Sequence, residues 1–415
     1  MIQYVLWAVS FVSLWISLVW LNVIVLEPSV KRPTRRQGSL PRVTIALPCY
    51  NKQPFLAKTV QSLAALNYPR ELLQIIIVDD CSTDKTFTEA KRLQRAYPQL
   101  NMSLIRHSCN QGKAGALNTA LAHATGALFA CLDADTRVHP DALRHHVSNF
   151  TDRHLGAVIS QVKVDEPRKF YERLQRVEYI FSNFIRRLMS NLGTLALTPG
   201  VLSMYRTDVL AKVGRFAEGG LTEDLEIALR LRANGYKVQM EPRALTFTSV
   251  PQKWGALWRQ RVRWYRGFVI NHFRYRHLLF KQEQGLYGMF QMPLNILGII
   301  MLLTTVLLVG YGNLSDLYEL LYRSLTIKGY FINHVLDFPS LKELLLGQNV
   351  QIMIPLILCL MLGAYLVYLA HKRFQEGLLK HIHHVVLYFV VAPYVTTVHW
   401  LAALMHEALG TRRKW

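Results

Sequence analysis

Long apolar runs at the two ends of the chain enclose a middle region of mixed polarity. Residues 2–26 are apolar and uncharged up to Glu27, a length that is sufficient to span a bilayer. Three further apolar runs follow towards the C-terminus, at about 289–309, 352–370 and 384–405. A polar, amphipathic connection separates the first two of these. We therefore expect about four transmembrane helices, one within residues 1–27 and the others within 286–415.

Basic residues beside the apolar runs indicate their orientation. Four Lys and Arg residues within 31–36 follow the first run, so the positive-inside rule places the next region in the cytoplasm. A cleaved signal peptide fits this run poorly, because it lacks a basic start and a small-residue cleavage site. The three later spans would then leave the C-terminus outside, whereas the basic residues at 412–414 favour the inside. Either the last segment, which Pro393 interrupts, does not cross fully or the short tail departs from the rule.

The middle region alternates between strand-like and helix-like hydrophobic patterns. This alternation over residues 42–160 is typical of a mostly parallel sheet with crossover helices. The expected strands cover residues 43–47, 74–78, 102–106 and 127–132. A helix is expected between the first two, over residues 52–66. The pattern predicts an α/β domain over residues 40–250.

Polar side chains follow each of these four expected strands. They are Asn51, Asp79, Asp80, Lys113, Asp133 and Asp135. An Asp-x-Asp pair alone is more often a turn or a helix cap than a ligand site. In an open parallel sheet, however, ligands bind just beyond the carboxyl ends of the strands, where all four loops meet. Two carboxylates there suit Mg²⁺ or Mn²⁺, which share their coordination with substrate phosphates. The glycine-bearing loop around Lys113 enters a helix and is a candidate phosphate neighbour.

Three later segments each admit a structural and a functional interpretation. Apolar residues in 168–192 recur every three or four positions, which fits a helix packed on the sheet or a basic amphipathic helix in the membrane interface. Thr222 can cap the helix at 225–234, whereas Asp224 in its first turn can act as a general base. Residues 251–285 combine Trp with Arg, as interfacial helices do, and the same residues suit sugar stacking and diphosphate pairing.

Composition narrows the class of protein further. The formal net charge is +21, half of the residues are hydrophobic, and the mean hydropathy is slightly positive. Such charge fits nucleic acid, an anionic membrane surface or an anionic substrate, but no nucleic-acid-binding signature is present. The five cysteines are scattered without metal-ligand spacing and indicate reduced thiols in a cytosol-facing protein. We expect a membrane surface and a phosphate-bearing substrate, and no nucleic acid.

Six motifs in order resemble the membrane-embedded family 2 glycosyltransferases, the group of the cellulose, hyaluronan, chitin and poly-N-acetylglucosamine synthases. The matching residues are Pro48-Cys49-Tyr50-Asn51, Val78-Asp79-Asp80 with Ser82-Thr83-Asp84, Gly112-Lys113-Ala114 with Ala116-Leu117-Asn118, Asp133-Ala134-Asp135, Thr222-Glu223-Asp224, and Gln260-Arg261-Val262-Arg263-Trp264. The last fits the family's Gln-x-x-Arg-Trp signature. The resemblance covers roughly residues 42–268 and extends to the flanking apolar runs.

The resemblance implies a GT-A type nucleotide-sugar-binding domain that uses a UDP-sugar and a divalent metal, Mg²⁺ or Mn²⁺. It implies that Asp224 deprotonates the acceptor hydroxyl and that Asp135 is the metal ligand. The implied donor-binding residues are Tyr50, Asn51, Asp79, Lys113, Asp133 and Arg263. The implied acceptor-binding residues are Glu223, Gln260 and Trp264. A single base without a carboxylate nucleophile fits a displacement that inverts the anomeric carbon.

The chain departs from the family pattern at three places. Lys52 stands where the family usually has an acid, and Cys81 replaces the glycine of an Asp-Asp-Gly-Ser loop, where a positive φ is easily adopted. The stretch Thr198-Pro199-Gly200 differs from the Ser-Gly loop expected near the acceptor, which leaves the sugar open. One span precedes the catalytic region, so a polymer channel would need interfacial helices, a homo-oligomer or an export subunit.

We expect an inverting, processive enzyme that elongates a β-linked polysaccharide from UDP-N-acetylglucosamine or UDP-glucose at the cytoplasmic face of the plasma membrane, coupled to export. Its partners would be the UDP-sugar, the growing glycan and the lipid bilayer. One alternative is transfer of a single sugar to a lipid acceptor. Another is a non-catalytic export subunit, which the presence of all the expected acids disfavours.

Overall fold

The computed structural model describes residues 2–25, 39–332 and 350–411 and divides into two compact units. The sheet-bearing unit comprises the described residues within 27–293, 383–388 and 399–415, and the helical unit comprises the rest. The basic residues predicted to orient the chain, at 31–36 and 412–414, lie outside the described residues.

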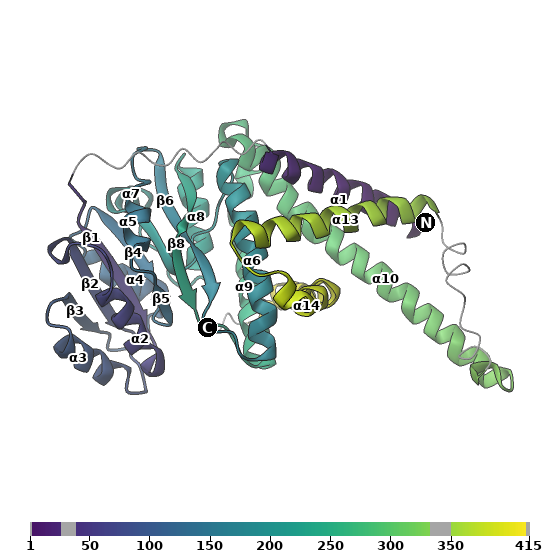
Figure 1. Ribbon diagram of the computed structural model, residues 1–415, viewed down its shortest axis with the longest axis horizontal. Helices are drawn as coiled ribbons and strands as arrows, with labels where there is room; N and C mark the ends of the chain where they lie inside the picture. The colour runs from purple at the N-terminus through teal and green to yellow at the C-terminus, as the bar shows by residue number, and fades with distance from the viewer. Residues whose placement is uncertain (1, 26–38, 333–349, 412–415) are drawn as a thin grey trace. The chain divides into compact units, whose positions relative to one another are not determined.

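An eight-stranded sheet forms the centre of the sheet-bearing unit (Figure 1). The strands are β1 (Val43–Cys49), β2 (Leu73–Asp79), β3 (Asn101–Arg106), β4 (Leu128–Leu132), β5 (Thr136–Val138), β6 (Leu155–Val164), β7 (Val201–Arg206) and β8 (Lys237–Thr248). Their order is β3-β2-β1-β4-β7-β6-β8-β5. All four expected strands are present within one or two residues of the predicted bounds.

The direction of the strands differs from the mostly parallel sheet that the alternating pattern predicted. β3, β2, β1 and β4 run parallel to one another, and β6 runs parallel to β8. β7, however, is antiparallel to both β4 and β6, and β5 is antiparallel to β8. The sheet is therefore mixed. Hydrophobic alternation identifies a strand but not its direction, because pairing depends on residues that are distant in the sequence.

Helices cover both faces of the parallel half of the sheet. Alternate residues of β1, including Val43, Ile45 and Leu47, share one buried cluster with α2 (Gln53–Ala64), α3 (Thr86–Ala96) and α5 (Ala142–Val147). The other side of β4 presents Phe129, which contacts Phe216. Asn118 of α4 (Gly112–Ala122) donates to the Phe216 carbonyl, so α4 lies on this opposite face. The period-two alternation of apolar side chains thus produces a sheet that is buried on two sides.

Four further helices complete the sheet-bearing unit up to residue 274: α6 (Phe170–Asn191), α7 (Thr207–Val213), α8 (Glu223–Ala233) and α9 (Trp254–Arg274). α6 packs on β6 and β8, and its Asn183 side chain bonds the backbone N–H and carbonyl of Val162. Of the two interpretations of segment 168–192, packing on the sheet is therefore confirmed, and its position in a membrane interface stays a prediction. Short helical turns occur at Arg70–Leu72, Arg276–Leu278, Gln282–Gln284, Tyr287–Gln291 and Leu379–His381.

Four described helices are long and apolar enough to cross a membrane. They are α1 (Ile2–Val25), α10 (Met292–Thr326), α13 (Val350–Arg373) and α14 (Ile382–Ala408), which agrees with the expected four apolar segments. α1 packs along α13, where the Cys359 thiol lies 3.3 Å from the Ser10 carbonyl oxygen. α10 continues well past the predicted end at 309, so the first part of the polar connection is helical. Residues 333–349 of that connection lie outside the described part.

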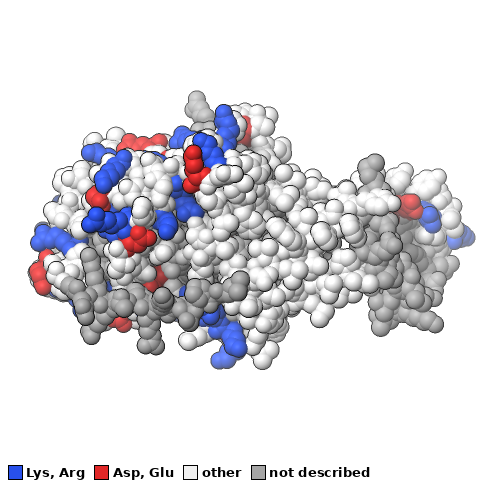
Figure 2. All heavy atoms as spheres, turned by 90° about the horizontal axis from the view of Figure 1, so that it is seen from above, with Lys and Arg blue, Asp and Glu red and all other residues white. Residues whose placement is uncertain are grey.

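Charged side chains are unevenly distributed between the two units. On the face shown in Figure 2, Lys, Arg, Asp and Glu gather over the sheet-bearing unit, whereas the long helices expose mainly uncharged side chains. Exposed large apolar residues on α10 and α13 include Leu307, Leu314, Leu360 and Met361. Contiguous apolar surface of this kind requires lipid or protein around it. The chain is therefore a membrane protein.

Candidate active site

Lys113 joins two carboxylates that come from distant parts of the chain. Its Nζ lies 2.6 Å from Asp133 Oδ1 and 3.1 Å from Glu223 Oε1. Lys113 stands in the first turn of α4, Asp133 directly follows β4, and Glu223 begins α8. The three residues, predicted at separate motifs, thus form one ionic cluster at the carboxyl end of the parallel strands.

Lys113 and Asp133 each stabilise the ionised form of the other. Burial disfavours the charged form of Lys113, but the neighbouring Asp133 and Glu223 carboxylates raise its pKa well above the usual value. Burial likewise opposes ionisation of Asp133, yet Lys113 holds the pKa of Asp133 below its usual value. Lys113 therefore remains a cation and Asp133 a carboxylate at neutral pH.

Asp224, the predicted base, follows Glu223 in the first turn of α8. Burial, and next the charge of Glu223, raise the pKa of Asp224 to about 6, although Lys113 and Arg263 oppose the shift. One carboxylate oxygen accepts the N–H of Leu225 at 2.8 Å, and the Thr198 hydroxyl donates to the Asp224 carbonyl at 2.7 Å. A carboxyl group with a pKa just below neutrality is mostly ionised at pH 7 and remains a usable proton acceptor.

Asp135, the predicted metal ligand, forms an ion pair with Lys52. Lys52 Nζ lies 2.6 Å from Asp135 Oδ2, and both side chains are partly exposed at the open end of the sheet. Within the described residues, no group of three or more His, Cys, Asp or Glu side chains is arranged to hold a metal. The donor chemistry fits a divalent ion that takes one carboxylate from the protein and further oxygens from a diphosphate. In this structure one oxygen of that carboxylate is paired with Lys52.

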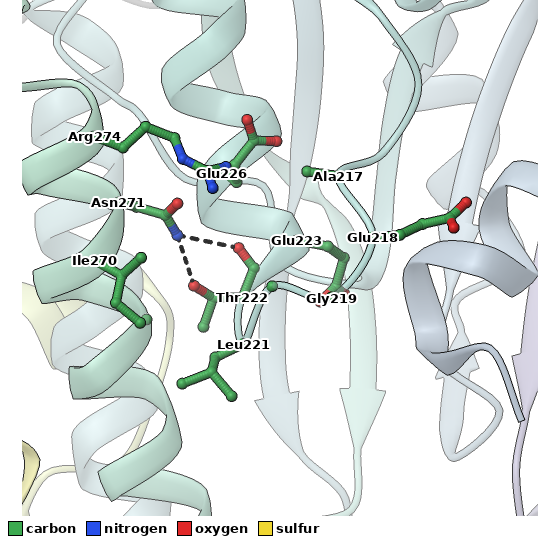
Figure 3. A pocket seen from close by; sticks show the side chains of 12 residues that line it. Ala217, Glu218, Gly219, Leu221, Thr222, Glu223, Glu226, Ile270, Asn271 and Arg274 are labelled. Carbon is green, nitrogen blue, oxygen red and sulfur yellow. Dashed lines mark hydrogen bonds between the residues drawn. The ribbon is translucent and has the colours of Figure 1, made fainter. Parts of the chain in front are cut away.

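The helix that carries the Gln-x-x-Arg-Trp motif, α9, packs against the start of α8. Asn271 donates to Thr222 Oγ1 at 3.0 Å, and a Cβ on Gly267 would clash with the Thr222 side chain (Figure 3). The expectation that Thr222 caps α8 is wrong, because its side chain makes no cap hydrogen bond. The hydroxyl of Thr222 instead accepts a hydrogen bond that holds the two helices together.

A pocket opens beside this helix contact. It is lined by residues 217–223 and by Glu226, Gly267, Ile270, Asn271 and Arg274. Glu223 thus borders both this pocket and the Lys113 cluster. The Arg263 guanidinium donates to the Leu221 carbonyl at 2.8 Å from the neighbouring turn of α9. Its charge acts on both Asp133 and Asp224, so Arg263 belongs to the same site.

Gln260 and Trp264, the other two residues of the Gln-x-x-Arg-Trp motif, lie in different environments. The Arg261 guanidinium lies 4.3 Å from the centre of the Trp264 ring and pairs with Glu178 at 2.8 Å. This contact fixes the plane of the half-buried indole. The side-chain oxygen of Gln260 is buried without a hydrogen-bond partner among the described residues. A buried acceptor of this kind is costly unless a ligand satisfies it.

The loops after β1 and β2 are fastened to each other. The Asn51 side-chain oxygen accepts hydrogen bonds from the backbone of Thr83 and Asp84, and the Asn51 N–H donates to Ser82 Oγ at 3.0 Å. The side-chain oxygen of Asn51, a residue predicted to bind the donor, is thus occupied by hydrogen bonds to the neighbouring loop. Tyr50 beside it is 47% exposed and is available to a ligand. Cys81 adopts a φ of 61°, so the turn keeps the conformation that favours glycine.

Asp79 ends β2 with a fully buried carboxylate. Arg106 Nε, from the end of β3, lies 3.1 Å from Asp79 Oδ2. Neither carboxylate oxygen has a well-aligned hydrogen bond within the described structure. The adjacent Asp80 is satisfied differently, by His107 Nδ1 at 2.7 Å and the Gln111 N–H at 2.8 Å. Asp79 is therefore the acid of this pair that retains hydrogen-bonding capacity.

Sequence reasoning missed Gly200 as a site residue. Its carbonyl accepts the Asp133 N–H at 2.8 Å. A Cβ on Gly200 would lie 2.6 Å from Asp133 Oδ1 and closer still to Lys113 Nζ. The Thr198-Pro199-Gly200 stretch departs from the family pattern in the sequence, but only the fold brings it against the cluster. The sequence signal was the glycine itself, placed directly before β7.

Residues 44–214 match the model of the family described as "Glycosyl transferase family 2". These residues contain β1 to β7 and four of the six resemblance motifs. The match covers less than half of the chain, so this part is similar to that family. The remaining two motifs lie outside it, at the start of α8 and on α9.

Two relatives resemble the chain beyond this domain. It is 31% identical over 239 residues to a poly-beta-1,6-N-acetyl-D-glucosamine synthase of Staphylococcus aureus, a match covering 57% of either chain. It is 31% identical over 227 residues to the synthase of the same name from Staphylococcus epidermidis, covering 54% of either chain. The chain thus matches little more than half the length of these relatives.

The glycosyltransferase fold also recurs among solved structures. A mannosyltransferase from Pyrobaculum calidifontis, solved with GDP-Man and Mn²⁺, superposes with a TM-score of 0.58 at 24% identity. The superposition covers 81% of this chain and 96% of that one. It supports the GT-A type fold expected from the sequence.

Proposed function

We propose that this protein is an inverting, divalent-metal-dependent glycosyltransferase that elongates a β-linked polysaccharide from a UDP-sugar at the cytoplasmic face of the plasma membrane. UDP-N-acetylglucosamine is the first donor to test, because both relatives named above are poly-N-acetylglucosamine synthases. UDP-glucose is the second. Coupling to export, and a homo-oligomer or export subunit, stay predictions within this proposal.

The observation that carries the proposal is the position of Asp224. A carboxyl group with a pKa of about 6 stands beside a cluster in which Lys113 lies within ion-pair distance of Asp133 and Glu223. Lys113 and Arg263 offer positive charge to an anionic leaving group, while Asp224 offers a base. A site with one free base and fixed cations suits a single displacement.

In the proposed step, Asp224 takes the proton of the acceptor hydroxyl. The hydroxyl oxygen bonds to the anomeric carbon as the bond from that carbon to the UDP oxygen breaks, and UDP leaves with the electron pair. Lys113 and Arg263 stabilise the charge that develops on the leaving diphosphate. A positioned carboxylate base contributes about two to four orders of magnitude in rate.

The other predicted residues divide between donor and acceptor. The buried carboxylate oxygens of Asp79 would accept hydrogen bonds from the base of the nucleotide. Tyr50, in the loop after β1, is exposed and available to the same ligand. Gln260, with its unsatisfied oxygen, and Trp264, with its fixed ring plane, would bind the acceptor sugar, as would Glu223. Asp135 would hold Mg²⁺ or Mn²⁺ against the diphosphate. A bound divalent ion would supply further positive charge to the leaving group.

The test is UDP release by the purified protein in detergent with a panel of UDP-sugars, with and without Mn²⁺ or Mg²⁺, followed by sizing of the products on a gel. Metal-dependent release with one donor and a long product is the expected result. A lipid product that carries one added sugar would show that the enzyme transfers a single sugar and does not make a polymer. Absence of UDP release with every donor, with lipid and glycan acceptors supplied, would overturn the proposal.

A further inference from the structure

Lys52 occupies a position that bears directly on metal binding. It is the first residue after Asn51, at the start of α2, and its backbone N–H donates to Thr86 Oγ1 at 2.8 Å. Its ammonium lies 2.6 Å from Asp135 Oδ2 and 5.6 Å from the centre of the Phe55 ring. Among the carboxylates in the described residues, Asp135 is the one within ion-pair distance of Lys52.

The ammonium and a divalent ion would compete for the same carboxylate. Asp135 has one negative charge, and two cations on its oxygens would repel each other at close range. We infer that Lys52 is a built-in competitor of the divalent ion at Asp135, which delays metal binding until the nucleotide diphosphate arrives. This inference rests on the metal dependence in the proposed function and adds a residue that controls it.

The charges around the site explain why the diphosphate would release this competition. Three cations, Lys52, Lys113 and Arg263, act on Asp133, and the acids Asp135, Glu223 and Asp224 lie beside the same cations. Of the three cations, Lys113 is committed to two carboxylates and Arg263 to the Leu221 carbonyl. Lys52 has a partly exposed, flexible side chain with a single carboxylate partner.

An incoming diphosphate adds negative charge beside the carboxylate that Lys52 pairs with. The Lys52 ammonium can then move to a phosphate oxygen, and Asp135 becomes free for the divalent ion. Metal and nucleotide should consequently bind with positive coupling, and by linkage each should tighten the other equally. Lys52 would account for part of this coupling between metal binding and nucleotide binding.

The experiment is a titration of Mn²⁺ followed by the electron paramagnetic resonance signal of the free ion, using full-length protein in detergent with and without UDP. Lys52→Gln should bind Mn²⁺ about tenfold more tightly than wild type without UDP, because the competing charge at Asp135 is gone. The same variant should bind UDP more weakly in EDTA. Misfolding cannot produce this pair of opposite changes.

Two control variants isolate the effect of position. Lys58→Gln removes an exposed lysine from the same helix and should leave the Mn²⁺ affinity at the wild-type value. Lys52→Arg keeps a cation beside Asp135 and should restore most of the competition. UDP should tighten Mn²⁺ binding by a larger factor in wild type than in Lys52→Gln.

Equal Mn²⁺ affinities for Lys52→Gln, Lys58→Gln and wild type would overturn the inference and leave the metal site in place. Failure of wild type to bind Mn²⁺ even with saturating UDP would overturn the metal dependence and the inference together. Neither result depends on the identity of the sugar or the acceptor, which the product assay tests separately.

Discussion

Two regions at the same end of the sheet use polar residues in opposite ways. In the loops after β1 and β2, Asn51, Ser82 and Asp84 bond to nearby backbone groups, so the side chains hold the loops in shape. Between β4, α4 and α8, charged side chains bond to one another, through Lys113 and its two carboxylates. The first region is fastened by hydrogen bonds to backbone groups, and the second is balanced electrostatically.

This difference indicates how each region should respond to substitution. Removing a residue from the fastened loops changes stability and nucleotide affinity. Removing one from the balanced cluster alters the ionisation of its neighbours and therefore the chemistry. The following variants test that distinction, in order of decreasing expected effect.

Asp224→Asn should lower the rate of sugar transfer by about two to four orders of magnitude, because the base is lost, while UDP binding stays near wild type. The measurements are UDP release and calorimetric UDP binding. Transfer at the wild-type rate would remove Asp224 from the role of base.

Thermal unfolding provides a control for the same variant. The folded-state pKa of Asp224 is raised from 3.8 to about 6, so the fold favours the neutral group. Its contribution to stability is fully present below about pH 3.8 and is lost as the pH rises through about 6. Asp224→Asn should therefore unfold at a higher temperature than wild type at pH 7.5, with a smaller difference at pH 5. A less stable variant at pH 7.5 would contradict the charge balance described for the cluster.

Gly200→Ala should lower kcat by about a hundredfold, because the new methyl group displaces the Lys113–Asp133 pair from its position. Gly255→Ala is the matched control, since a Cβ there meets only Arg259 Nη1 at 3.7 Å. Steady-state kinetics of both variants should separate them. Equal kcat values would mean that the cluster adjusts to the methyl group without cost to catalysis.

Glu223→Gln should move the acidic limb of the pH–rate profile to lower pH. The Glu223 charge raises the pKa of Asp224, after burial, so its removal lets Asp224 remain ionised in more acidic solution. Activity falls in wild type as the pH drops through about 6 and should persist below that in the variant. If the acidic limb of the profile lies at the same pH in both enzymes, a group other than Asp224 causes it.

Cys81→Gly should raise the stability by up to about 1 kcal/mol without changing kcat, because glycine adopts the φ of 61° without steric cost. Cys109→Gly is the opposite control, since Cys109 is not among the residues with positive φ. Thermal unfolding at one pH compares the two. A loss of stability in Cys81→Gly would show that the thiol contributes more than its weak contact with the Ser108 carbonyl.

The sequence predicted the elements and their chemistry well where local pattern decides them. Each expected strand of the parallel half was found, and the two acids after β4 pair with Lys113 and Lys52 at the edge where the parallel strands end. It was wrong about Thr222, whose hydroxyl bonds Asn271 rather than its own helix. It also missed Gly200 and the antiparallel course of β7.

By itself, the amino-acid sequence determined the four strands of the parallel half, the four apolar helices and the acids at those strand ends, because hydrophobic period and residue type are local properties. Only the tertiary structure decided that Lys113 bridges Asp133 and Glu223 and that Lys52 pairs with Asp135. The pKa of Asp224 was decided there as well. Coulomb energy and desolvation depend on distance in space, and residues up to 110 positions apart become neighbours only when the sheet has formed.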